Sequence, residues 1–209
     1  MTRIVLDDAA GRALAVEALR RGEIVAIPTD TVYGLAASGD VPGSIDRLFE
    51  VKARPADRAI AVLLAEVTQA EALVDLPPAG RLLGEAFWPG GLTLVVGQRE
   101  DHPLPPELTG GRSTIGIRVP DHPTPRALAA ALGPLPTTSA NISGEPELRD
   151  AAEIAQRLGA GLGLVLDGGP ARGGTASTVV DVTQDPPQIL REGAIPRNLV
   201  ELRLRDMGR

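Results

Sequence analysis

The stretch that decides the fold class reads Glu23-Ile-Val-Ala-Ile-Pro-Thr-Asp-Thr-Val-Tyr-Gly34. Its first half is a short apolar run that ends at a proline, which is the pattern of a buried β-strand. Residues 8–21 before it place Ala, Leu and Val at helical spacing between an Asp and an Arg-Arg-Gly, the signature of a capped helix. A helix followed by a buried strand predicts an α/β fold.

Small polar residues, Thr29 to Gly34, follow this predicted strand directly. The carboxyl end of a strand is where open α/β sheets tend to bind ligands, so Thr29, Asp30 and Thr31 are candidate binding residues. The alternative is a turn in which one of these side chains caps the backbone.

The alternation of helix and strand patterns continues along the chain. Helices are predicted over 43–52, 66–74, 80–87, 124–132 and 149–158, and strands over 59–64, 92–96, 113–120, 162–167, 177–182 and 188–193. No repeat or compositional break divides the chain, which favours one domain over residues 1–209, with a core at about 10–195 and a charged tail at 197–209. The Pro- and Gly-rich loop 98–112 is long enough to be a lid.

Composition excludes several function classes. The 209 residues carry a net charge of −6, so the surface as a whole repels polyanions and a nucleotide must be held by a local arginine cluster. Without cysteine there is no disulfide, Cys-ligated metal or thiol nucleophile, and two histidines leave little for a His-rich metal site. No apolar stretch approaches the roughly 20 residues that span a bilayer, and no apolar run follows basic residues at the N-terminus, so we expect a cytoplasmic protein.

Lys52 is the only lysine of the chain, since the other 20 of its 21 basic residues are arginines. It stands two residues before Arg54, and Pro55 prevents the preceding helix from continuing. A compact ammonium beside a planar guanidinium suits the binding of phosphate or carboxylate. The alternative is a lysine on a solvated helix end.

Ser113-Thr-Ile-Gly-Ile-Arg-Val-Pro120 alternates with a period of two. Ile115, Ile117 and Val119 therefore share one face of a strand, and Thr114, Gly116 and Arg118 share the other. An arginine in mid-strand needs an anion or a carboxylate partner, although an outward surface salt bridge would also satisfy it.

Thr137-Thr-Ser-Ala-Asn-Ile-Ser-Gly144 carries four hydroxyls and one amide in eight residues. This composition predicts a loop that donates several hydrogen bonds to a polar ligand. By contrast, Phe87-Trp-Pro-Gly-Gly91 reads as a structural turn anchored by a buried Trp88. The glycines around Arg172 are a weak phosphate-binding signal, because the Walker pattern is absent.

Several of these motifs, taken in order, resemble the YrdC/Sua5 family, the threonylcarbamoyl-AMP synthases, in its short single-domain form. The resemblance covers about residues 10–195. It is carried by the motifs Pro-Thr-Asp-Thr-Val-Tyr-Gly-Leu, Lys-Ala-Arg-Pro, Trp-Pro-Gly-Gly-Leu-Thr, Ile-Arg-Val-Pro, Thr-Ser-Ala-Asn-Ile-Ser-Gly, Ser-Thr-Val-Val-Asp and Leu-Arg-Glu-Gly-Ala-Ile.

This resemblance implies a twisted mixed sheet flanked by helices, with a concave, positively charged groove. It also implies a nucleotidyltransferase that condenses L-threonine, bicarbonate and ATP to threonylcarbamoyl-AMP and pyrophosphate. The product would serve the t6A modification of tRNA through a Kae1/TsaD-type threonylcarbamoyl transferase, with at most a weak tRNA contact of its own and no membrane contact. Mg²⁺ would be carried by the ATP phosphates, since no carboxylate cluster offers a dedicated site.

The resemblance also implies residue roles. Catalysis is expected from Lys52 and Arg54. Threonine and bicarbonate would be bound by Thr31, Arg118, Thr137 and Ser177, and ATP by Arg54, Arg58, Thr114, Ser139, Asn141 and Arg191. We expect Arg118 to hold the threonine carboxylate through two parallel hydrogen bonds.

The chain departs from the family pattern after the Lys-x-Arg element. Many members carry Asn-Pro-Leu and a nearby histidine there, whereas this chain reads Arg58-Ala-Ile-Ala-Val-Leu-Leu64. Arg58 is therefore a less secure ATP contact, and Leu63 removes a possible threonine contact. The extra C-terminal domain of the longer Sua5 type is not expected.

Two other functions compete with this one. A carbamoyl-transfer module of the hydrogenase-maturation kind shares the domain but is embedded beside cysteine-rich zinc segments. An RNA- or tRNA-binding module without catalysis is disfavoured by the acidic charge and by the 2% aromatic content.

Overall fold

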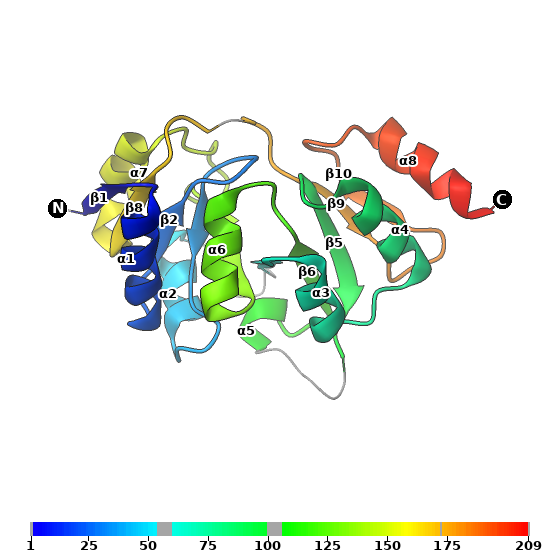
Figure 1. Ribbon diagram of the computed structural model, residues 1–209, viewed down its shortest axis with the longest axis horizontal. Coiled ribbons are helices and arrows are strands. Elements are labelled where there is room, and N and C mark those ends of the chain that lie inside the picture. Colours follow the sequence, from blue (N-terminus) through cyan, green and yellow to red (C-terminus); the bar gives the residue numbers. More distant parts are fainter. Residues whose placement is uncertain (1, 54–59, 100–105, 172, 209) are drawn as a thin grey trace.

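The computed structural model describes residues 2–53, 60–99, 106–171 and 173–208 (Figure 1). The strands are β1 (Arg3–Leu6), β2 (Val25–Ile27), β3 (Gly34–Ala36), β4 (Ala61–Leu63), β5 (Leu92–Gly97), β6 (Thr114–Arg118), β7 (Leu135–Ser139), β8 (Leu164–Asp167), β9 (Thr178–Asp181) and β10 (Gln188–Arg191). The helices are α1 (Ala9–Arg20), α2 (Ser44–Val51), α3 (Val67–Leu73), α4 (Pro78–Phe87), α5 (Pro106–Thr109), α6 (Pro123–Leu132), α7 (Ala151–Leu158) and α8 (Arg197–Arg205), with 3-10 turns at Gly159–Gly161 and Asp206–Gly208.

The ten described strands form one sheet in the order β1-β8-β2-β3-β7-β4-β6-β5-β9-β10. Neighbours β1–β8, β2–β8, β4–β6 and β5–β9 are parallel, and the other pairs are antiparallel. The predicted mixed α/β sheet flanked by helices is therefore confirmed. β8 lies near one edge of the sheet, and β9, the next strand along the chain, lies near the other edge.

The first helix illustrates how the sequence builds these elements. The Asp8 side chain caps α1 by accepting a hydrogen bond of 2.8 Å from the Gly11 amide. Ala15 and Leu19, spaced by one helical turn, are fully buried in a small core cluster between α1, α6 and the sheet. In Figure 1, α1 and α6 lie side by side, and the two helices are in contact.

Trp88 is buried in the main core cluster, and its indole nitrogen donates to the carbonyl of Leu92 at 2.7 Å. The turn at 87–91 is thus anchored as predicted, because the ring contributes buried area while its one polar atom is satisfied.

Two strands were not predicted. β3 follows the polar turn after β2, and the last three residues of β7 fall in the hydroxyl-rich stretch 137–144 that was predicted to be a loop. The two strands pair with each other, with Gly34 opposite Ser139. Small polar side chains suit a loop when each stretch is considered alone, but they also fit a strand whose one face lines a cavity. The edge strand β1 was not predicted either, because three of its four residues are exposed and lack an alternating pattern.

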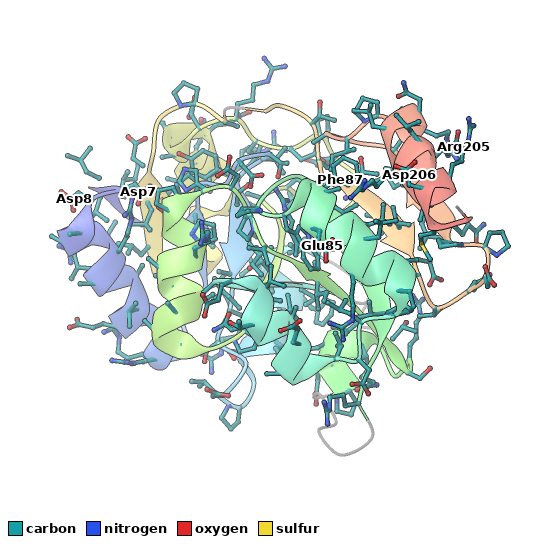
Figure 2. All side chains as sticks on the ribbon, turned by 45° about the vertical axis from the view of Figure 1, so that its right-hand side comes forward. Asp7, Asp8, Glu85, Phe87, Arg205 and Asp206 are labelled. Carbon is teal, nitrogen blue, oxygen red and sulfur yellow. The ribbon has the colours of Figure 1, made fainter. Side chains whose placement is uncertain are left out.

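The predicted charged tail is largely a helix. In α8, Val200 is fully buried and packs into the main core, while four of the helix's residues are charged. Figure 2 shows α8, with Arg205 labelled, beside α4, with Phe87 labelled, and the two helices are in contact. A pattern dominated by charge concealed the apolar stripe that holds this helix on the protein.

The predicted loop 98–112 also contains a short helix, α5, whose Leu108 is 3% exposed. The Leu108 carbonyl accepts a hydrogen bond of 2.9 Å from the amide of Ile60. At least this part of the segment is packed on the protein, and a lid function stays a prediction. None of the described helices has the length and apolar character that crossing a membrane requires.

Candidate active site

One face of the central strands forms the floor of a cavity of about 480 Å³. Its lining includes small residues on three central strands: Gly34 on β3, Ala61 on β4 and Gly116 on β6. Because their side chains are short or missing, the sheet is hollowed there. Hydroxyl and guanidinium groups from the surrounding strands form the walls. Seven of the predicted site residues line the cavity: Thr31, Thr114, Arg118, Thr137, Ser139, Ser177 and Arg191.

The predicted alternation along β6 is confirmed. Ile115, Ile117 and Val119 are at most 1% exposed and belong to the core, whereas Thr114, Gly116 and Arg118 all line the cavity. The period-two pattern therefore placed Arg118 on the correct face.

Arg118 is 6% exposed and is held by three acceptors. Its Nη2 donates to Asp30 Oδ1 at 2.6 Å, its Nη1 to Thr31 Oγ1 at 2.9 Å, and its Nε to the carbonyl of Gly90 at 2.9 Å. These bonds use three of the five N–H groups of a guanidinium, so one on each terminal nitrogen remains for a ligand. The alternative of a surface salt bridge is wrong, because the pair with Asp30 is buried at the cavity wall.

Burial lowers the pKa of Arg118, the neighbouring Asp30 carboxylate opposes this effect, and the positive charge of Arg191 adds to it. Arginine nonetheless stays charged at any physiological pH, because its ordinary value is far above 7. A carboxylate or phosphate that approached the two arginines would reduce their mutual repulsion.

Arg191 and Ser177 form a neighbouring part of the wall together with Thr93, which lies on β5, the strand paired with β6. Arg191 Nη2 donates to the Ser177 carbonyl at 2.8 Å and to its Oγ at 3.2 Å. The hydroxyls of Thr93 and Ser177 lie 2.8 Å apart. This wall thus presents a guanidinium and two hydroxyls, a set that can bind an oxyanion and fix its orientation.

Thr29–Thr31 forms the predicted side-chain-capped turn and also contributes a residue to the candidate binding site. Thr29 Oγ1 accepts from the Thr31 amide at 3.1 Å and donates to the Val32 carbonyl at 2.6 Å, which makes a side-chain-stabilised turn. The same turn directs the Thr31 hydroxyl to Arg118 at the cavity wall. The turn is therefore the device that positions a candidate binding residue.

Lys52 is 2% exposed, so the reading as a solvated helix end is wrong. Its Nζ donates to the Ser139 carbonyl at 2.6 Å, to Ser139 Oγ at 3.1 Å and to Asn141 Oδ1 at 2.5 Å. Ser139 lines the cavity, but Lys52 and Asn141 do not. The ammonium thus lies directly behind the Ser139 hydroxyl, one residue away from the cavity.

Arg54 and Arg58, predicted to bind ATP, lie outside the described residues, and so does Arg172. Their roles stay predictions, as does the positive character of the groove. Within the described part of the chain no group of three His, Cys, Asp or Glu side chains could hold a metal ion, and Mg²⁺ bound through ATP also stays a prediction.

Sequence reasoning missed three residues that line the cavity: Thr93, Arg112 and Asp181. Asp30, which the sequence indicated as a candidate binding residue, supports Arg118 from outside the lining. Thr93 could have been found, since it is the one polar residue in the apolar run Leu92–Val96. Arg112 carries no such local signal.

A mixed α/β sheet whose central face pairs arginines with small hydroxyls over a cavity defines a protein that binds a small anionic or zwitterionic ligand. The sequence model of the Sua5, YciO and YrdC family, described as telomere recombination, matches residues 17–193. The chain therefore belongs to this family.

Relatives of known name support the assignment. The chain is 39% identical to a threonylcarbamoyl-AMP synthase of Bacillus subtilis, over 90% of this chain and 55% of the relative. It is 33% identical to the threonylcarbamoyl-AMP synthase of Vibrio vulnificus, over 85% of this chain and 96% of that protein. The crystal structure of Pyrococcus abyssi Sua5 complexed with L-threonine has a TM-score of 0.89 and 35% identity, over 97% of this chain and 60% of the other. The chain thus spans little more than half the length of the longer relatives.

Proposed function

We propose that this protein is a nucleotidyltransferase that condenses L-threonine, bicarbonate and ATP to threonylcarbamoyl-AMP, with release of pyrophosphate. The observation that carries the proposal is the Arg118 guanidinium, fixed by Asp30, Thr31 and Gly90 at the cavity wall with two N–H groups left for a carboxylate. The names of the relatives and the complex of Pyrococcus abyssi Sua5 with L-threonine support threonine as the amino acid.

Two steps account for the chemistry. The neutral amine of threonine attacks the carbon of CO2, or of bicarbonate with loss of hydroxide, and after losing a proton it becomes a carbamate. A carbamate oxygen then attacks the α-phosphorus of ATP, the bond to the bridging oxygen breaks, and pyrophosphate leaves. Neither step requires a protein nucleophile. The protein must align the reactants and stabilise negative charge, which suits a site of arginines and hydroxyls.

Different residues of the cavity would bind the amino acid and the nucleotide. Arg118, Thr31, Thr137 and Ser177 would bind threonine and bicarbonate, while Thr114, Ser139 and Arg191 would contact ATP. Lys52 and Asn141 would act through Ser139, and Lys52 would offset charge on the carbamate and phosphates together with Arg54. Mg²⁺ that arrives with the ATP phosphates would neutralise part of their charge.

The product is a mixed anhydride, and its use in tRNA t6A modification would need a Kae1/TsaD-type transferase as the next enzyme. We also propose that tRNA itself is contacted weakly at most, since the net charge of −6 opposes binding of a polyanion.

One assay tests the activity. The protein is mixed with radiolabelled bicarbonate, L-threonine, ATP and Mg²⁺, and both pyrophosphate and an acid-labile labelled adenylate are followed. The proposal requires both products to depend on threonine. Pyrophosphate release without threonine would favour the carbamoyl-transfer module. Tight RNA binding at physiological salt without any adenylate would favour the RNA-binding module.

A further inference from the structure

The centre of the cavity floor contains a glycine that the protein's own structure does not require. Gly116 lies in the middle of β6 and is paired in regular register with β4 on one side and β5 on the other. Its φ is not positive, so no special backbone conformation calls for glycine. Glycine inside a strand weakens the strand, and it often marks a bulge or the close approach of a ligand. The regular pairing excludes a bulge here.

Space for a side chain distinguishes Gly116 from Gly34, the other strand glycine that lines the cavity. A Cβ at position 116 would lie 3.4 Å from Thr93 Cγ2 and 3.8 Å from Ala61 Cβ, which is ordinary contact. A Cβ at Gly34 would lie 2.7 Å from the methyl group of Thr137, which does not fit without a shift. Packing therefore accounts for glycine at 34 and leaves glycine at 116 without a structural cause.

The surroundings of Gly116 indicate which part of a ligand would lie there. Its neighbours across the sheet, Ala61 and Val95, are apolar and half-buried, and both line the cavity. The guanidinium groups lie beyond the two ends of this patch, with Arg118 at one end of β6 and Arg112 just before the other. A flat apolar floor suits the face of a ring better than a small charged group.

We propose that Gly116 is a contact residue for the nucleoside of ATP, which lies on the floor formed by Ala61, Val95 and Gly116. This inference rests on the proposed function, because ATP is the only one of the three substrates that carries a ring system. Any side chain at 116 would raise the floor beneath the ring. Glycine at this position then sets the affinity for the nucleotide and leaves the fold unaffected.

Gly116→Ala and Gly116→Val test the inference through thermal stability and nucleotide affinity. For the alanine variant the first should rise and the second should fall. The alanine variant should melt about 1–4 °C higher than the wild type, because strand glycine is replaced by a better strand former. Calorimetry with a non-hydrolysable ATP analogue and Mg²⁺ should show affinity reduced by about 5-fold to 100-fold, more for valine than for alanine. L-Threonine affinity should change by less than about 2-fold.

Gly97 supplies the matched control. It lies on β5, is exposed, lies outside the cavity lining and has no atom within 4 Å of its would-be Cβ. Gly97→Ala and Gly97→Val should therefore leave both affinities unchanged. Gly34→Ala should instead lower the melting temperature, because its added methyl group meets Thr137.

The outcomes separate the inference from the proposed function. If Gly116 variants bind the ATP analogue like the wild type, or lose affinity only in proportion to a lower melting temperature, the inference is overturned although adenylate is still made. If the wild type binds ATP but forms no adenylate, the proposed function fails and the glycine series still decides the inference. If the wild type binds no ATP, both are overturned.

Discussion

Arg118 and Lys52 are both buried cations, 6% and 2% exposed, yet their surroundings differ in kind. Arg118 lies on the cavity wall, paired with the carboxylate of Asp30, and retains two N–H groups. Lys52 lies behind Ser139, a residue of the wall, and its described acceptors include three oxygen atoms of Ser139 and Asn141. Burial alone therefore does not distinguish a cation that lines the cavity from one that lies behind a residue of its wall.

Replacing Arg118 by lysine should produce the largest effect. One ammonium cannot keep the bonds to Asp30, Thr31 and Gly90 and also offer a planar pair of donors to a carboxylate. We expect turnover to fall on the order of 10²-fold or more, with weaker threonine binding, in the pyrophosphate assay. Arg126→Lys is the control, since Arg126 donates to the Ala65 carbonyl and lies outside the cavity lining. Threonine affinity equal to that of the wild type would remove Arg118 from the site.

Replacing Lys52 by methionine should lower the stability of the protein. The stem of the side chain is retained, but Asn141 Oδ1 and the Ser139 carbonyl lose a buried donor. The free energy of unfolding in urea should fall by about 1–3 kcal/mol. Turnover measured well below the melting temperature then tells whether Lys52 also has the predicted catalytic role. An unchanged urea midpoint would contradict the view that Lys52 holds the Ser139–Asn141 segment in place.

Tyr33 connects the Ser139–Asn141 segment to the loop after β8 and should give the smallest effect. Its carbonyl accepts from the Ala140 amide, next to Ser139, while its hydroxyl accepts from the Gly168 amide at 3.0 Å and donates to the Gly169 carbonyl at 2.7 Å. Tyr33→Phe should lower the free energy of unfolding by about 0.5–1.5 kcal/mol at neutral pH.

The same tyrosine predicts a pH dependence. Burial raises its pKa, although the Gly168 amide opposes the shift. Above about pH 10 the unfolded chain releases this proton while the folded protein retains it, so the unfolded state binds fewer protons and stability falls as pH rises. Because Tyr33 is the only tyrosine, tyrosinate absorbance reports its titration directly. A midpoint at or below the ordinary value would contradict the prediction, and Tyr33→Phe should lack this component of the alkaline loss.

Local patterns in the sequence predicted much of the fold. The helix before β2, with its Asp8 cap, and the two faces of β6 follow from spacing alone, because helical and strand periodicities are set by the backbone. Prediction failed where short strands depend on partners. β3 is only three residues long and follows a polar turn, and β7 is rich in hydroxyls; both are strands because each is paired on both sides, β3 with β2 and β7, and β7 with β3 and β4.

The candidate site residues show the same contrast between what local patterns predicted and what depended on distant partners. Arg118 was placed on the correct face by alternation, and the threonines at 31 and 137 by their position after or within polar stretches. Thr93, Arg112 and Asp181 were missed. Thr93 interrupts an apolar run and could have been noticed, whereas nothing near Arg112 or Asp181 in the sequence indicates that either side chain faces a cavity. Lys52 was noted for its rarity, but its place behind Ser139 could not be read from composition.

The sequence by itself determined the class of fold, the strand face that carries Arg118, and the chemistry open to a chain without cysteine. Tertiary structure alone decided that Asp30 meets Arg118, 88 residues away, and that Lys52 meets Asn141, 89 residues away. The physical reason is the range of the interactions. Side-chain direction is fixed by the nearest backbone, whereas contacts between distant residues depend on the order in which ten strands join one sheet.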